Sequence, residues 1–325
     1  MDFQERYLTY KKWIEQYLVE SIEERKPRSL YLPLKYVLSG GGKRIRPVLV
    51  LAACEAVGGR AEQAVHAGAA IEMLHNFTLV HDDIMDNADA RRGRKTVHRK
   101  WDVNVAILTG DELLARAYRI LLQTESPRIR EISRVFTDGV VEVCEGQAYD
   151  KEFEEQPRVT VEDYLLMINK KTGKLVAVST EIGGLIGDGT DAELGALRLY
   201  GEYVGRAFQI QDDLLDIMGD ERTFGKKIGG DLREGKKTFL LLEGWRRTRG
   251  ADRELLRRVV EKRKISDEHV KRIRRVYQSC GALEAAKDRI TGDIRRAKAT
   301  LDALRPGEGK SMLLWLTDML LHRTF

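Results

Sequence analysis

The sequence predicts an all-α fold, a single bundle of helices whose facing sides line a central apolar cavity. Apolar residues recur at helical spacing along most of the chain, and the alternation typical of strands is nearly absent. Glycine-rich joints separate the periodic segments, among them residues 183–189 and 225–235. Because cavities in helical bundles form between facing helices, we expect the functional side chains to lie there.

The first break in the pattern is the run Ser39–Gly42, which follows the apolar stretch Leu30–Leu38. Pro47 is expected to open a helix that runs to about Val57, because proline suits a first helical turn. The other predicted helices are Ala61–Asp86, Asn104–Leu122, Ile129–Tyr149, Val161–Leu185, Leu194–Met218, Lys237–Arg246, Ala251–Lys262, Asp267–Ser279, Ala282–Leu304 and Ser311–His322.

The composition favours one domain spanning residues 1–325. The chain has six prolines and no Pro/Ser-rich linker, and its 56 Lys and Arg against 51 Asp and Glu predict a surface of mixed charge, with no nucleic-acid partner. Cys54, Cys144 and Cys280 are odd in number and lack metal-ligand spacing, which indicates a reducing compartment. No apolar run approaches the roughly 18 residues of a membrane span. The N-terminus carries no signal-peptide core, so we expect a cytoplasmic protein.

One short acidic pattern occurs twice, at residues 82–86 and, 130 residues later, at 212–216. With 23 aspartates in the chain, such a pattern is expected by chance about 0.1 times. Side chains three and four residues apart share a helix face, so Asp82 and Asp83 are expected to project alongside Asp86. Such crowding is unfavourable unless cations neutralise it. Mg²⁺ suits this role, because it takes one or two carboxylates and fills its shell with water and phosphate oxygens.

Basic residues occur at places that suit phosphate groups. The glycine-rich turn at 41–47 precedes a helix start, where backbone N–H groups favour anions. This turn carries the cations Lys43, Arg44 and Arg46. Arg91 and Arg92 lie one short loop past the first acidic pattern, and their guanidinium groups match phosphate oxygens. The second half of the chain adds Lys171, Lys226 and Lys236.

His75 lies seven residues before Asp82, which is about 20° round an ideal helix and two turns away. It is therefore expected on the side of the carboxylates, where the neutral and the charged imidazole both suit a ligand role. The alternative is an ordinary packed histidine of an apolar helix.

Together these segments resemble the trans-isoprenyl diphosphate synthases, or polyprenyl synthase family, and most of all its short-chain geranylgeranyl and farnesyl members. The matching motifs follow the family order and spacing from about residue 39 to residue 238, and the helical remainder fits. They are Gly41-Gly42-Lys43-Arg44-Ile45-Arg46-Pro47, His81-Asp82-Asp83-Ile84-Met85-Asp86, Arg91-Arg92-Gly93, Thr109-Gly110-Asp111, Lys171-Thr172, Gln209-Ile210-Gln211-Asp212-Asp213-Leu214-Leu215-Asp216, Gly225-Lys226 and Gly230-Asp231. The resemblance implies the isoprenoid-synthase helical bundle and a homodimer.

The resemblance also implies a reaction, in which isopentenyl diphosphate condenses with dimethylallyl, geranyl or farnesyl diphosphate. About three Mg²⁺ ions per site would assist departure of the allylic diphosphate. The double bond of isopentenyl diphosphate would attack the resulting cation, and the departed diphosphate would take the proton. No protein nucleophile is needed.

The family roles carry over to matching positions of this chain. Metal would be held by Asp82, Asp83, Asp86, Asp212, Asp213 and Asp216, which form the catalytic set with Lys171 and Lys226. The allylic diphosphate would bind Arg91, Lys171 and Lys226, with Lys236 close by. Isopentenyl diphosphate would bind Lys43, Arg46, His75 and Arg92. Thr172 and Gln209 would flank the reacting carbons. The spacing also admits Lys227 in place of Lys226.

Product length in this family depends on the helix that enters the first acidic pattern. Phe77 would form the floor of the chain pocket, with Thr78 and Leu74 as smaller neighbours. One aromatic residue beside a small one, without a two-residue insertion in the acidic pattern, resembles the geranylgeranyl type. We therefore expect a C20 product, with C15 as the alternative. Plain core packing is the alternative for Phe77.

Other functions deserve comparison. A class I terpene cyclase usually carries an Asn/Ser/Glu motif at the second acidic position and lacks the cations of residues 41–47. A non-catalytic subunit of a heteromeric prenyl synthase tends to lose the acidic motifs, which are intact here. Arg257–Arg275 is rich in Lys and Arg, but interspersed acidic and apolar residues favour a solvated amphipathic helix over a nucleic-acid binder. Glycines in residues 225–235 further predict a hinged closure over the diphosphate.

Overall fold

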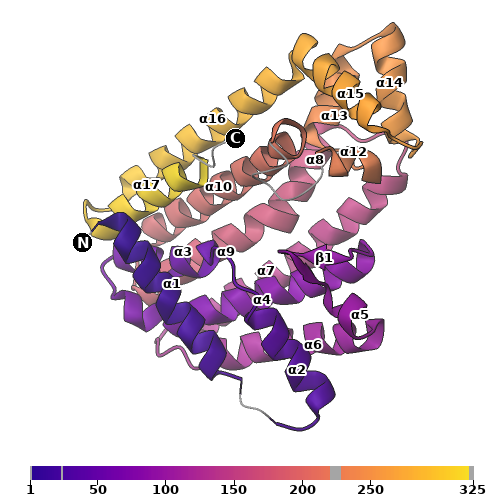
Figure 1. Ribbon diagram of the computed structural model, residues 1–325. Coiled ribbons are helices and arrows are strands. Elements are labelled where there is room, and N and C mark those ends of the chain that lie inside the picture. The colour runs from indigo at the N-terminus through magenta and orange to yellow at the C-terminus, as the bar shows by residue number, and fades with distance from the viewer. Residues whose placement is uncertain (1, 23–24, 220–227, 322–325) are drawn as a thin grey trace. The chain divides into compact units, whose positions relative to one another are not determined.

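The computed structural model describes residues 2–22, 25–219 and 228–321, and it confirms the all-α prediction. Figure 1 shows helices joined mainly by short connections. In chain order the elements are α1 (Phe3–Glu20), α2 (Arg28–Leu38), α3 (Ile45–Ala56), η1 (Ala61–Ala64), α4 (Val65–Met85), β1 (Ala90–Arg91), β2 (Arg94–Lys95), α5 (Val97–Lys100), α6 (Val103–Leu121), α7 (Ile129–Glu155), α8 (Val161–Ile168), η2 (Asn169–Gly173), α9 (Lys174–Ile186), α10 (Asp191–Met218), α12 (Gly230–Glu234), α13 (Phe239–Arg247), α14 (Gly250–Val260), α15 (Asp267–Ser279), α16 (Ala282–Thr300), η3 (Leu301–Ala303) and α17 (Glu308–Leu321).

The chain forms two compact units. Unit 1 consists of Met1–Val140, Val178–Arg198 and Asp302–Trp315, and unit 2 consists of Val141–Ala177, Leu199–Leu301 and Leu316–Phe325. The helices α7, α9 and α10 each contribute residues to both units. The single domain over residues 1–325, and a cavity enclosed by the bundle as a whole, therefore stay predictions.

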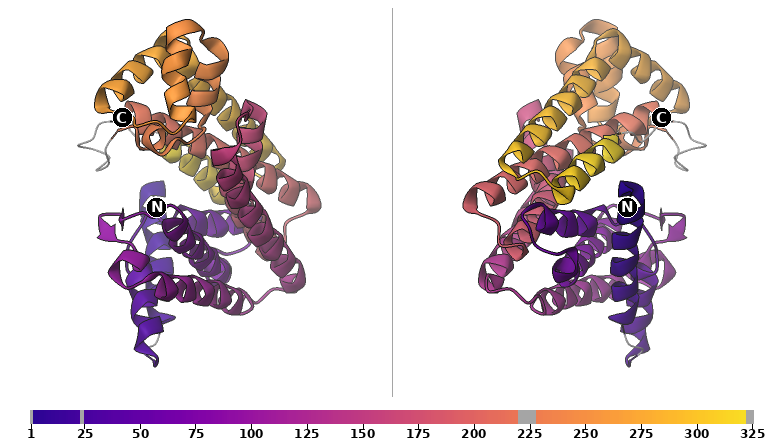
Figure 2. Two further views of the ribbon diagram at one scale, coloured as in Figure 1. Left: turned by 90° about the vertical axis from the view of Figure 1, so that its right-hand side faces the viewer. Right: turned by 90° about the vertical axis from the view of Figure 1, so that its left-hand side faces the viewer.

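Helix α4 forms the centre of unit 1, where it packs against α1, α3 and α6 (Figure 2). A helix that is apolar all round belongs inside a protein, and most residues of α4 before the acidic pattern are buried. Gly68 permits its approach to α1 and α3, because a Cβ there would lie 3.0 Å from side-chain atoms of Ile14 and Leu51. This packing places the end of α4, which bears the first acidic pattern, at a defined position in unit 1.

Glycines also allow α3 and the unit 1 part of α9 to pack closely. A Cβ at Gly183 would lie 2.2 Å from the carbonyl oxygen of Val50, and one at Gly187 would lie 2.5 Å from that of Cys54. Any side chain at these positions would push the two backbones apart. The glycine-rich stretch at residues 183–189, which the sequence presents as a joint, is therefore partly a packing device.

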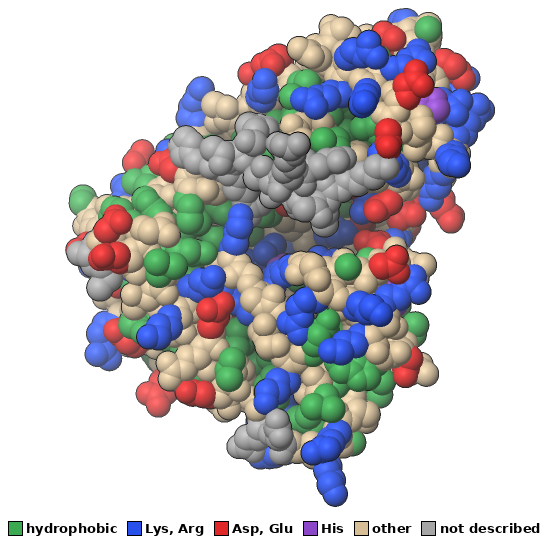
Figure 3. Space-filling model, in the orientation of Figure 1, with side chains coloured by type: hydrophobic (Ala, Val, Ile, Leu, Met, Phe, Trp, Pro, Cys, Tyr) green, Lys and Arg blue, Asp and Glu red, His purple; other side chains and the backbone are tan. Residues whose placement is uncertain are grey.

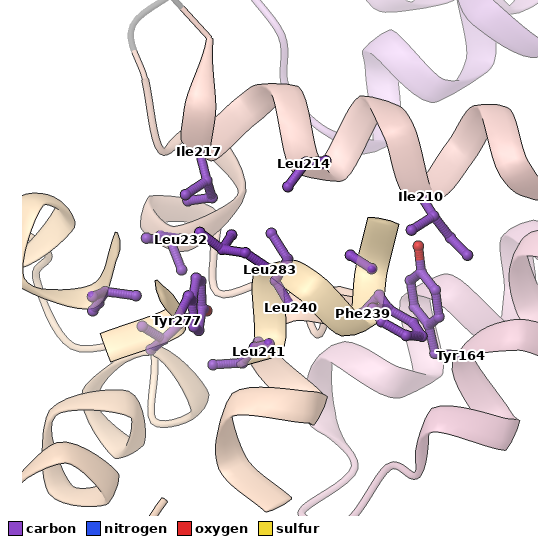
Figure 4. Packing of buried hydrophobic residues seen from close by; sticks show 14 of the residues in the cluster. Tyr164, Ile210, Leu214, Ile217, Leu232, Phe239, Leu240, Leu241, Tyr277 and Leu283 are labelled. Atoms are coloured by element: carbon purple, nitrogen blue, oxygen red, sulfur yellow. The ribbon is translucent and has the colours of Figure 1, made fainter. Parts of the chain in front are cut away.

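The core of unit 2 forms where α8, α10, α13, α15 and α16 meet, and Figure 4 shows this cluster at close range. Leu214, Leu240 and Tyr277 are buried at its centre. Asp293 of α16 is fully buried and accepts two hydrogen bonds from Arg206 of α10, from Nε at 2.6 Å and from Nη2 at 2.7 Å. A buried charge requires such a partner, so this pair fixes α16 against the helix that bears the second acidic pattern.

Several elements differ from the sequence predictions. Helix α1 was not predicted, although Tyr7, Tyr10, Ile14 and Leu18 recur at helical spacing and are buried. The predicted helix at 161–185 is interrupted by η2, a single π turn. Residues 90–95 form an antiparallel two-stranded hairpin, which was not predicted from the sequence.

Helix α3 begins at Ile45, two residues before Pro47. Its N-cap, Arg44, has a φ of 51° and thus lies in the left-handed region. Proline is still tolerated there, because the backbone N–H groups of the first turn have no partner inside the helix.

Among the helices of the described residues, none is long and apolar enough to cross a membrane. The three cysteines are free thiols, and Cys54 is buried. In Figure 3, blue Lys and Arg side chains are interspersed with red Asp and Glu over the region of α14 and α15 at the upper right. This mixture agrees with the solvated surface expected for residues 257–275, although the stretch is not one helix, because it spans the end of α14, a connection at residues 261–266 and most of α15.

Candidate active site

The first acidic pattern lies at the C-terminal end of α4, in unit 1. Asp82 is half-buried, and Asp86 is exposed and caps the helix. Asp83 is only 5 % exposed, and its Oδ1 accepts a hydrogen bond from Nε of Arg91 at 2.8 Å. The prediction that Asp82 and Asp83 project together beside Asp86 therefore needs refinement. Asp82 and Asp86, the first and last carboxylates of the pattern, are the more accessible ones. Asp83, the middle carboxylate, binds an arginine.

The packing of α4 against α6 explains the motif Thr109-Gly110-Asp111. A Cβ at Gly110 would lie 2.2 Å from Nε2 of His81, so only glycine leaves room for that ring. His81 Nε2 lies 3.3 Å from the carbonyl oxygen of Ile107 and 3.9 Å from Oδ1 of Asp111. The residue before the first acidic pattern is thus seated on α6, which fixes the rotation of α4 at its end.

A tight hairpin positions Arg91 and Arg92. Ala90 pairs with Lys95 and Arg91 with Arg94, so Arg92 and Gly93 form the turn. Both turn residues have positive φ, 51° and 73°. Turns of this kind match the twist of antiparallel strands but strain a residue that has a Cβ, as Arg92 does. This hairpin was not predicted from the sequence, in which Arg91 and Arg92 were placed one short loop past the first acidic pattern.

The glycine-rich turn at 41–47 and the hairpin are in contact. Nη1 of Arg92 donates a hydrogen bond to the carbonyl oxygen of Gly41. A Cβ at Gly42, whose φ is 143°, would lie 2.7 Å from the same nitrogen. These glycines therefore make room for the Arg92 guanidinium beside the predicted phosphate-binding turn.

The three cations of this turn have different environments. Lys43 is exposed, whereas Arg44 is 4 % exposed and forms an ion pair with the buried Glu72. Arg44 also donates from Nη2 to the carbonyl oxygen of Leu38 at 3.0 Å. Arg44 therefore anchors the turn to α4, and Lys43 and Arg46 are the cations that remain suited to a ligand.

Arg46 and His75 are in contact, with Nη1 of Arg46 at 3.3 Å from Nε2 of His75. Burial, followed by the charge of Arg46, holds the pKa of His75 well below its usual value. The imidazole is therefore neutral. Because a guanidinium only donates, Nε2 of His75 is the acceptor and the ring proton lies on Nδ1. Of the two forms that the sequence left open, the structure supports the neutral one.

A pocket of about 60 Å³ lies beside these groups in unit 1. Asp83, Arg91 and Arg92 line one part of it, and Tyr36 and Arg94 line another. The guanidinium carbon of Arg94 lies 3.8 Å from the centroid of the Tyr36 ring, a cation–π contact that holds the arginine in place.

The three residues predicted to determine product length have different environments. Leu74 is fully buried, and the hydroxyl of Thr78 donates to the carbonyl oxygen of His75 at 2.8 Å. Phe77 is half-buried and packs edge-on against His81, with ring centroids 4.8 Å apart. Phe77 is therefore the one of the three with a large, partly accessible apolar surface.

The second acidic pattern lies on α10 in unit 2. Asp212 is half-buried, and Asp213 is buried and accepts hydrogen bonds from Tyr164 Oη at 2.5 Å and Gln209 Nε2 at 3.1 Å. Asp216 accepts from the backbone N–H groups of Gly230 and Asp231, at 3.1 and 3.2 Å. The middle aspartate thus faces inward in both patterns, and the last one of this pattern holds the start of α12.

Burial raises the pKa of Asp213 to about 7, against the opposing effect of its hydrogen bonds. Burial also raises the pKa values of Asp216 and Asp231, and the charges of Asp213 and Asp216 add to the effect on Asp231. Several neighbouring carboxyl groups with raised pKa values indicate a place where a bound cation would be favourable.

The π turn η2 presents the motif Lys171-Thr172. Nζ of Lys171 lies 2.6 Å from Oδ2 of Asp150, and Oγ1 of Thr172 donates to Oε1 of Gln209 at 2.9 Å. Gly146 of α7 permits the close approach, because a Cβ there would lie 2.3 Å from the backbone nitrogen of Lys171. Turns of this type occur frequently at functional sites.

Of the remaining predicted residues, Lys236 forms an ion pair with Glu234 at 2.8 Å and lies 3.9 Å from Asp231. Lys226, its neighbour Lys227 and the predicted hinge residue Gly225 lie outside the described residues, as does the C-terminal tail after Leu321. Hydrogen bonds join Asp83 to Arg91 in unit 1 and Asp213 to Gln209 and, through it, to Thr172 in unit 2, and the grouping of the other predicted residues around the acidic patterns stays a prediction. Convergence of the two patterns stays a prediction.

Within the described parts of the chain, no three His, Cys, Asp or Glu side chains form a group that could hold a metal ion by themselves. Mg²⁺ does not require such a cage, since it binds through one or two carboxylates and completes its octahedron with water and phosphate oxygens. Asp82 and Asp86, four residues apart and accessible, fit this chemistry, and so does the half-buried Asp212.

Sequence reasoning missed three residues of this site. Asp150 binds Lys171, Tyr164 binds Asp213, and Gly146 admits the π turn. An isolated glycine inside a helical pattern often has a packing reason, which was the available signal for Gly146. Asp150 and Tyr164 carry no such signal, because their partners lie 21 and 49 residues away in sequence.

A family model described as Polyprenyl synthetase matches residues 27–277. A short chain isoprenyl diphosphate synthase from Methanothermobacter thermautotrophicus is 38 % identical over 317 residues, which cover 97 % of this chain and 96 % of the relative. A geranylgeranyl pyrophosphate synthase from Geoglobus acetivorans is 39 % identical over 315 residues, 96 % of each chain. The crystal structure of geranylgeranyl pyrophosphate synthetase from Pyrococcus horikoshii Ot3 has a TM-score of 0.93 at 36 % identity and covers 99 % of both chains.

The family match includes both acidic patterns and every predicted basic residue, and the relatives align along nearly the whole chain. The resemblance inferred from the motifs is thereby confirmed. The chain belongs to the polyprenyl synthetase family and is a trans-prenyltransferase.

Proposed function

We propose that this chain condenses isopentenyl diphosphate with dimethylallyl, geranyl or farnesyl diphosphate, and that geranylgeranyl diphosphate (C20) is its main product. The observation that carries the proposal is that each unit combines one acidic pattern with basic side chains. Asp82 lies on the same helix as His75, which contacts Arg46, and Asp86 is the C-cap of that helix. Asp212 lies on the same helix as Gln209, which contacts Thr172, the neighbour of Lys171. The names of the similar proteins support the C20 product.

Each step of the reaction then has a group to serve it. Mg²⁺ ions, about three per site, would be held by the outer carboxylates, and they supply charge that stabilises the departing diphosphate. Arg91, Lys171 and Lys236, with Lys226, add positive charge around the allylic diphosphate. Lys43, Arg46 and Arg92 bind isopentenyl diphosphate, and the neutral His75 keeps the guanidinium of Arg46 in place.

The bonds change as follows. The allylic C–O bond breaks and diphosphate leaves with the electron pair. The double bond of isopentenyl diphosphate attacks the allylic cation and forms the new C–C bond. A proton then leaves the neighbouring carbon and passes to the departed diphosphate, which restores a double bond. Apolar side chains such as Phe77 exclude water that would otherwise capture the cation.

We further propose that the protein is a cytoplasmic homodimer. Val103, Ile107 and Leu108 are large apolar residues exposed along α6, and burial of such residues is what a second copy of the chain would provide. Analytical ultracentrifugation of the wild type and of Ile107→Glu tests the dimer. A monomeric wild type would contradict it.

The function is tested by incubating the purified protein with labelled isopentenyl diphosphate, Mg²⁺ and each allylic primer, and sizing the products. Elongation that ends at C20 is the expected result. A C15 end point would support the enzyme activity and contradict the C20 product. Cyclised hydrocarbon would identify a terpene cyclase, and no condensation with any primer would favour a non-catalytic partner subunit.

A further inference from the structure

Tyr164 is a buried residue whose hydroxyl is hydrogen-bonded to the second acidic pattern. Its side chain is 2 % exposed, and Oη donates to Oδ2 of Asp213 at 2.5 Å. Figure 4 shows the ring below α10, with its hydroxyl oxygen directed toward that helix. The tyrosine comes from α8, seven residues before Lys171, so it is supported by the segment that also carries the π turn.

The same carboxylate continues into a chain of hydrogen bonds. Oδ1 of Asp213 accepts from Nε2 of Gln209 at 3.1 Å, and Oε1 of Gln209 accepts from Oγ1 of Thr172 at 2.9 Å. The order of donors is fixed along this chain. When Asp213 is ionised its carboxylate only accepts, so the amide presents its NH₂ group to Asp213 and its oxygen to Thr172. The hydroxyl of Thr172 then has to donate rather than accept.

The phenol hydroxyl fixes the plane of the carboxylate. With Oδ2 held by Tyr164, the second oxygen of Asp213 can point in only one direction, which is toward Gln209. Without that donor, the carboxylate can rotate about its Cβ–Cγ bond, and one buried oxygen loses its partner. The amide of Gln209 and the hydroxyl of Thr172 would then lose the orientation that the chain imposes.

We propose that Tyr164 is a positioning residue for the condensation, acting through Asp213 to orient Gln209 and Thr172. The inference rests on the proposed function, in which these two side chains flank the reacting carbons. A misplacement of reacting groups by a fraction of an ångström lowers the rate of the chemical step more than it lowers substrate affinity. The consequence of losing the hydroxyl should therefore fall on kcat.

The test is a double-mutant cycle with Tyr164→Phe, Gln209→Ala and the combined variant. Tyr164→Phe removes one oxygen and keeps the ring. It is expected to lower kcat about tenfold, with the KM for isopentenyl diphosphate changed by less than about twofold. In the Gln209→Ala background the same substitution should lower kcat no further, because the group that it orients is already absent.

Tyr277→Phe is the matched control. Tyr277 is fully buried in the same apolar cluster, and its hydroxyl has no hydrogen-bond partner within the described residues. Both substitutions delete a buried phenol oxygen. If the effect of Tyr164→Phe were merely structural, that variant would have a lowered melting temperature and an unchanged kcat. Tyr277→Phe is expected to leave kcat unchanged.

Two outcomes would overturn the inference. One is a Tyr164→Phe enzyme with the kcat of the wild type. The other is a loss of kcat that is equally large with and without Gln209. These results differ from a failure of the proposed function, which would show as a wild-type protein that condenses nothing.

Discussion

Nε of Arg91 donates to Oδ1 of Asp83 at 2.8 Å, which ties the hairpin arginine to the middle aspartate of the first acidic pattern. Burial raises the pKa of Asp83, and the charge of Arg91 opposes that shift. The carboxylate and the guanidinium therefore support each other inside unit 1. Asp83 binds an arginine, and its neighbours Asp82 and Asp86 are the more accessible carboxylates of the pattern.

Asp83→Ala is expected to raise the KM for the allylic diphosphate by about tenfold or more, because hydrogen bonds to charged groups contribute about 1.5–3 kcal/mol. Asp83→Asn keeps an oxygen acceptor and should have a smaller effect. The Mg²⁺ concentration that gives half-maximal rate should stay as in the wild type. A large shift of that concentration in Asp83→Ala would instead make Asp83 a metal ligand.

Asp86→Asn should lower kcat by about 10²–10³-fold, the usual effect of losing a group that stabilises transition-state charge. Its position at the exposed end of α4 predicts little change in melting temperature. Removal of metal with a chelator should stop condensation, and added Mg²⁺ should restore it. Asp89→Asn, three residues further on and 86 % exposed, is the control and should behave as the wild type. Full activity of Asp86→Asn would argue against the metal assignment.

His75 predicts a specific dependence of stability on pH. Its pKa in the folded protein is well below the value of ~6.5 expected in the unfolded chain. The unfolded chain therefore binds the proton more readily, and the free energy of unfolding falls as the pH drops below ~6.5. His75→Gln cannot bind this proton. The free energies of unfolding of the two proteins, measured with urea, should therefore change differently between about pH 7.5 and pH 5. Parallel pH profiles would show that His75 is not the group responsible.

Phe77→Ala is expected to yield products longer than C20, because it removes the large, partly accessible ring that would close the chain pocket. Leu74→Ala is the contrasting variant. Leu74 is fully buried, so its truncation should lower the free energy of unfolding by about 2–5 kcal/mol and leave the product length unchanged. Chromatography of the labelled products, together with denaturant unfolding, separates the two effects. If Phe77→Ala still made C20 products, Phe77 would have only a core-packing role and would not determine product length.

Gly146→Ala should lower kcat and stability together. The new Cβ would lie 2.3 Å from the backbone nitrogen of Lys171, and backbone atoms cannot move aside as a flexible side chain can. Gly195→Ala provides the control, because nothing lies within 4 Å of a Cβ there. Since alanine favours helix over glycine by about 0.8–1.0 kcal/mol, the control should be slightly more stable than the wild type. Opposite signs for the two substitutions would confirm the contact.

The sequence predicts the periodic helices well and the local exceptions poorly. The segments that became α4, α6 and α10 have strong apolar repeats, and their ends lie within a few residues of the expected ones. The hairpin at 90–95 was missed because it contains two-residue strands and a left-handed Arg92, and neither leaves a periodic signal. The π turn was missed because a one-residue expansion hardly disturbs the apolar pattern of 161–185.

The candidate site shows the same limit. Residue type and spacing singled out the candidate carboxylates and cations, whose roles stay predictions. They could not separate Arg44, which is buried against Glu72, from the exposed Lys43 beside it. They also could not identify Tyr164, whose role depends on a contact 49 residues away. Such distinctions depend on which side chain the fold turns inward, and a linear motif does not record that.

The π turn at residues 169–173 has a consequence for how the length of this chain can vary. Each residue in a helix adds about 100° of rotation, so deleting one residue here would turn α9 by that amount relative to α8. Val178 and Ile182, both fully buried, would then face outward. Surface loops absorb insertions and deletions easily, but this turn cannot. Related sequences are therefore expected to differ in length elsewhere and to keep the same number of residues between Tyr164 and Val178.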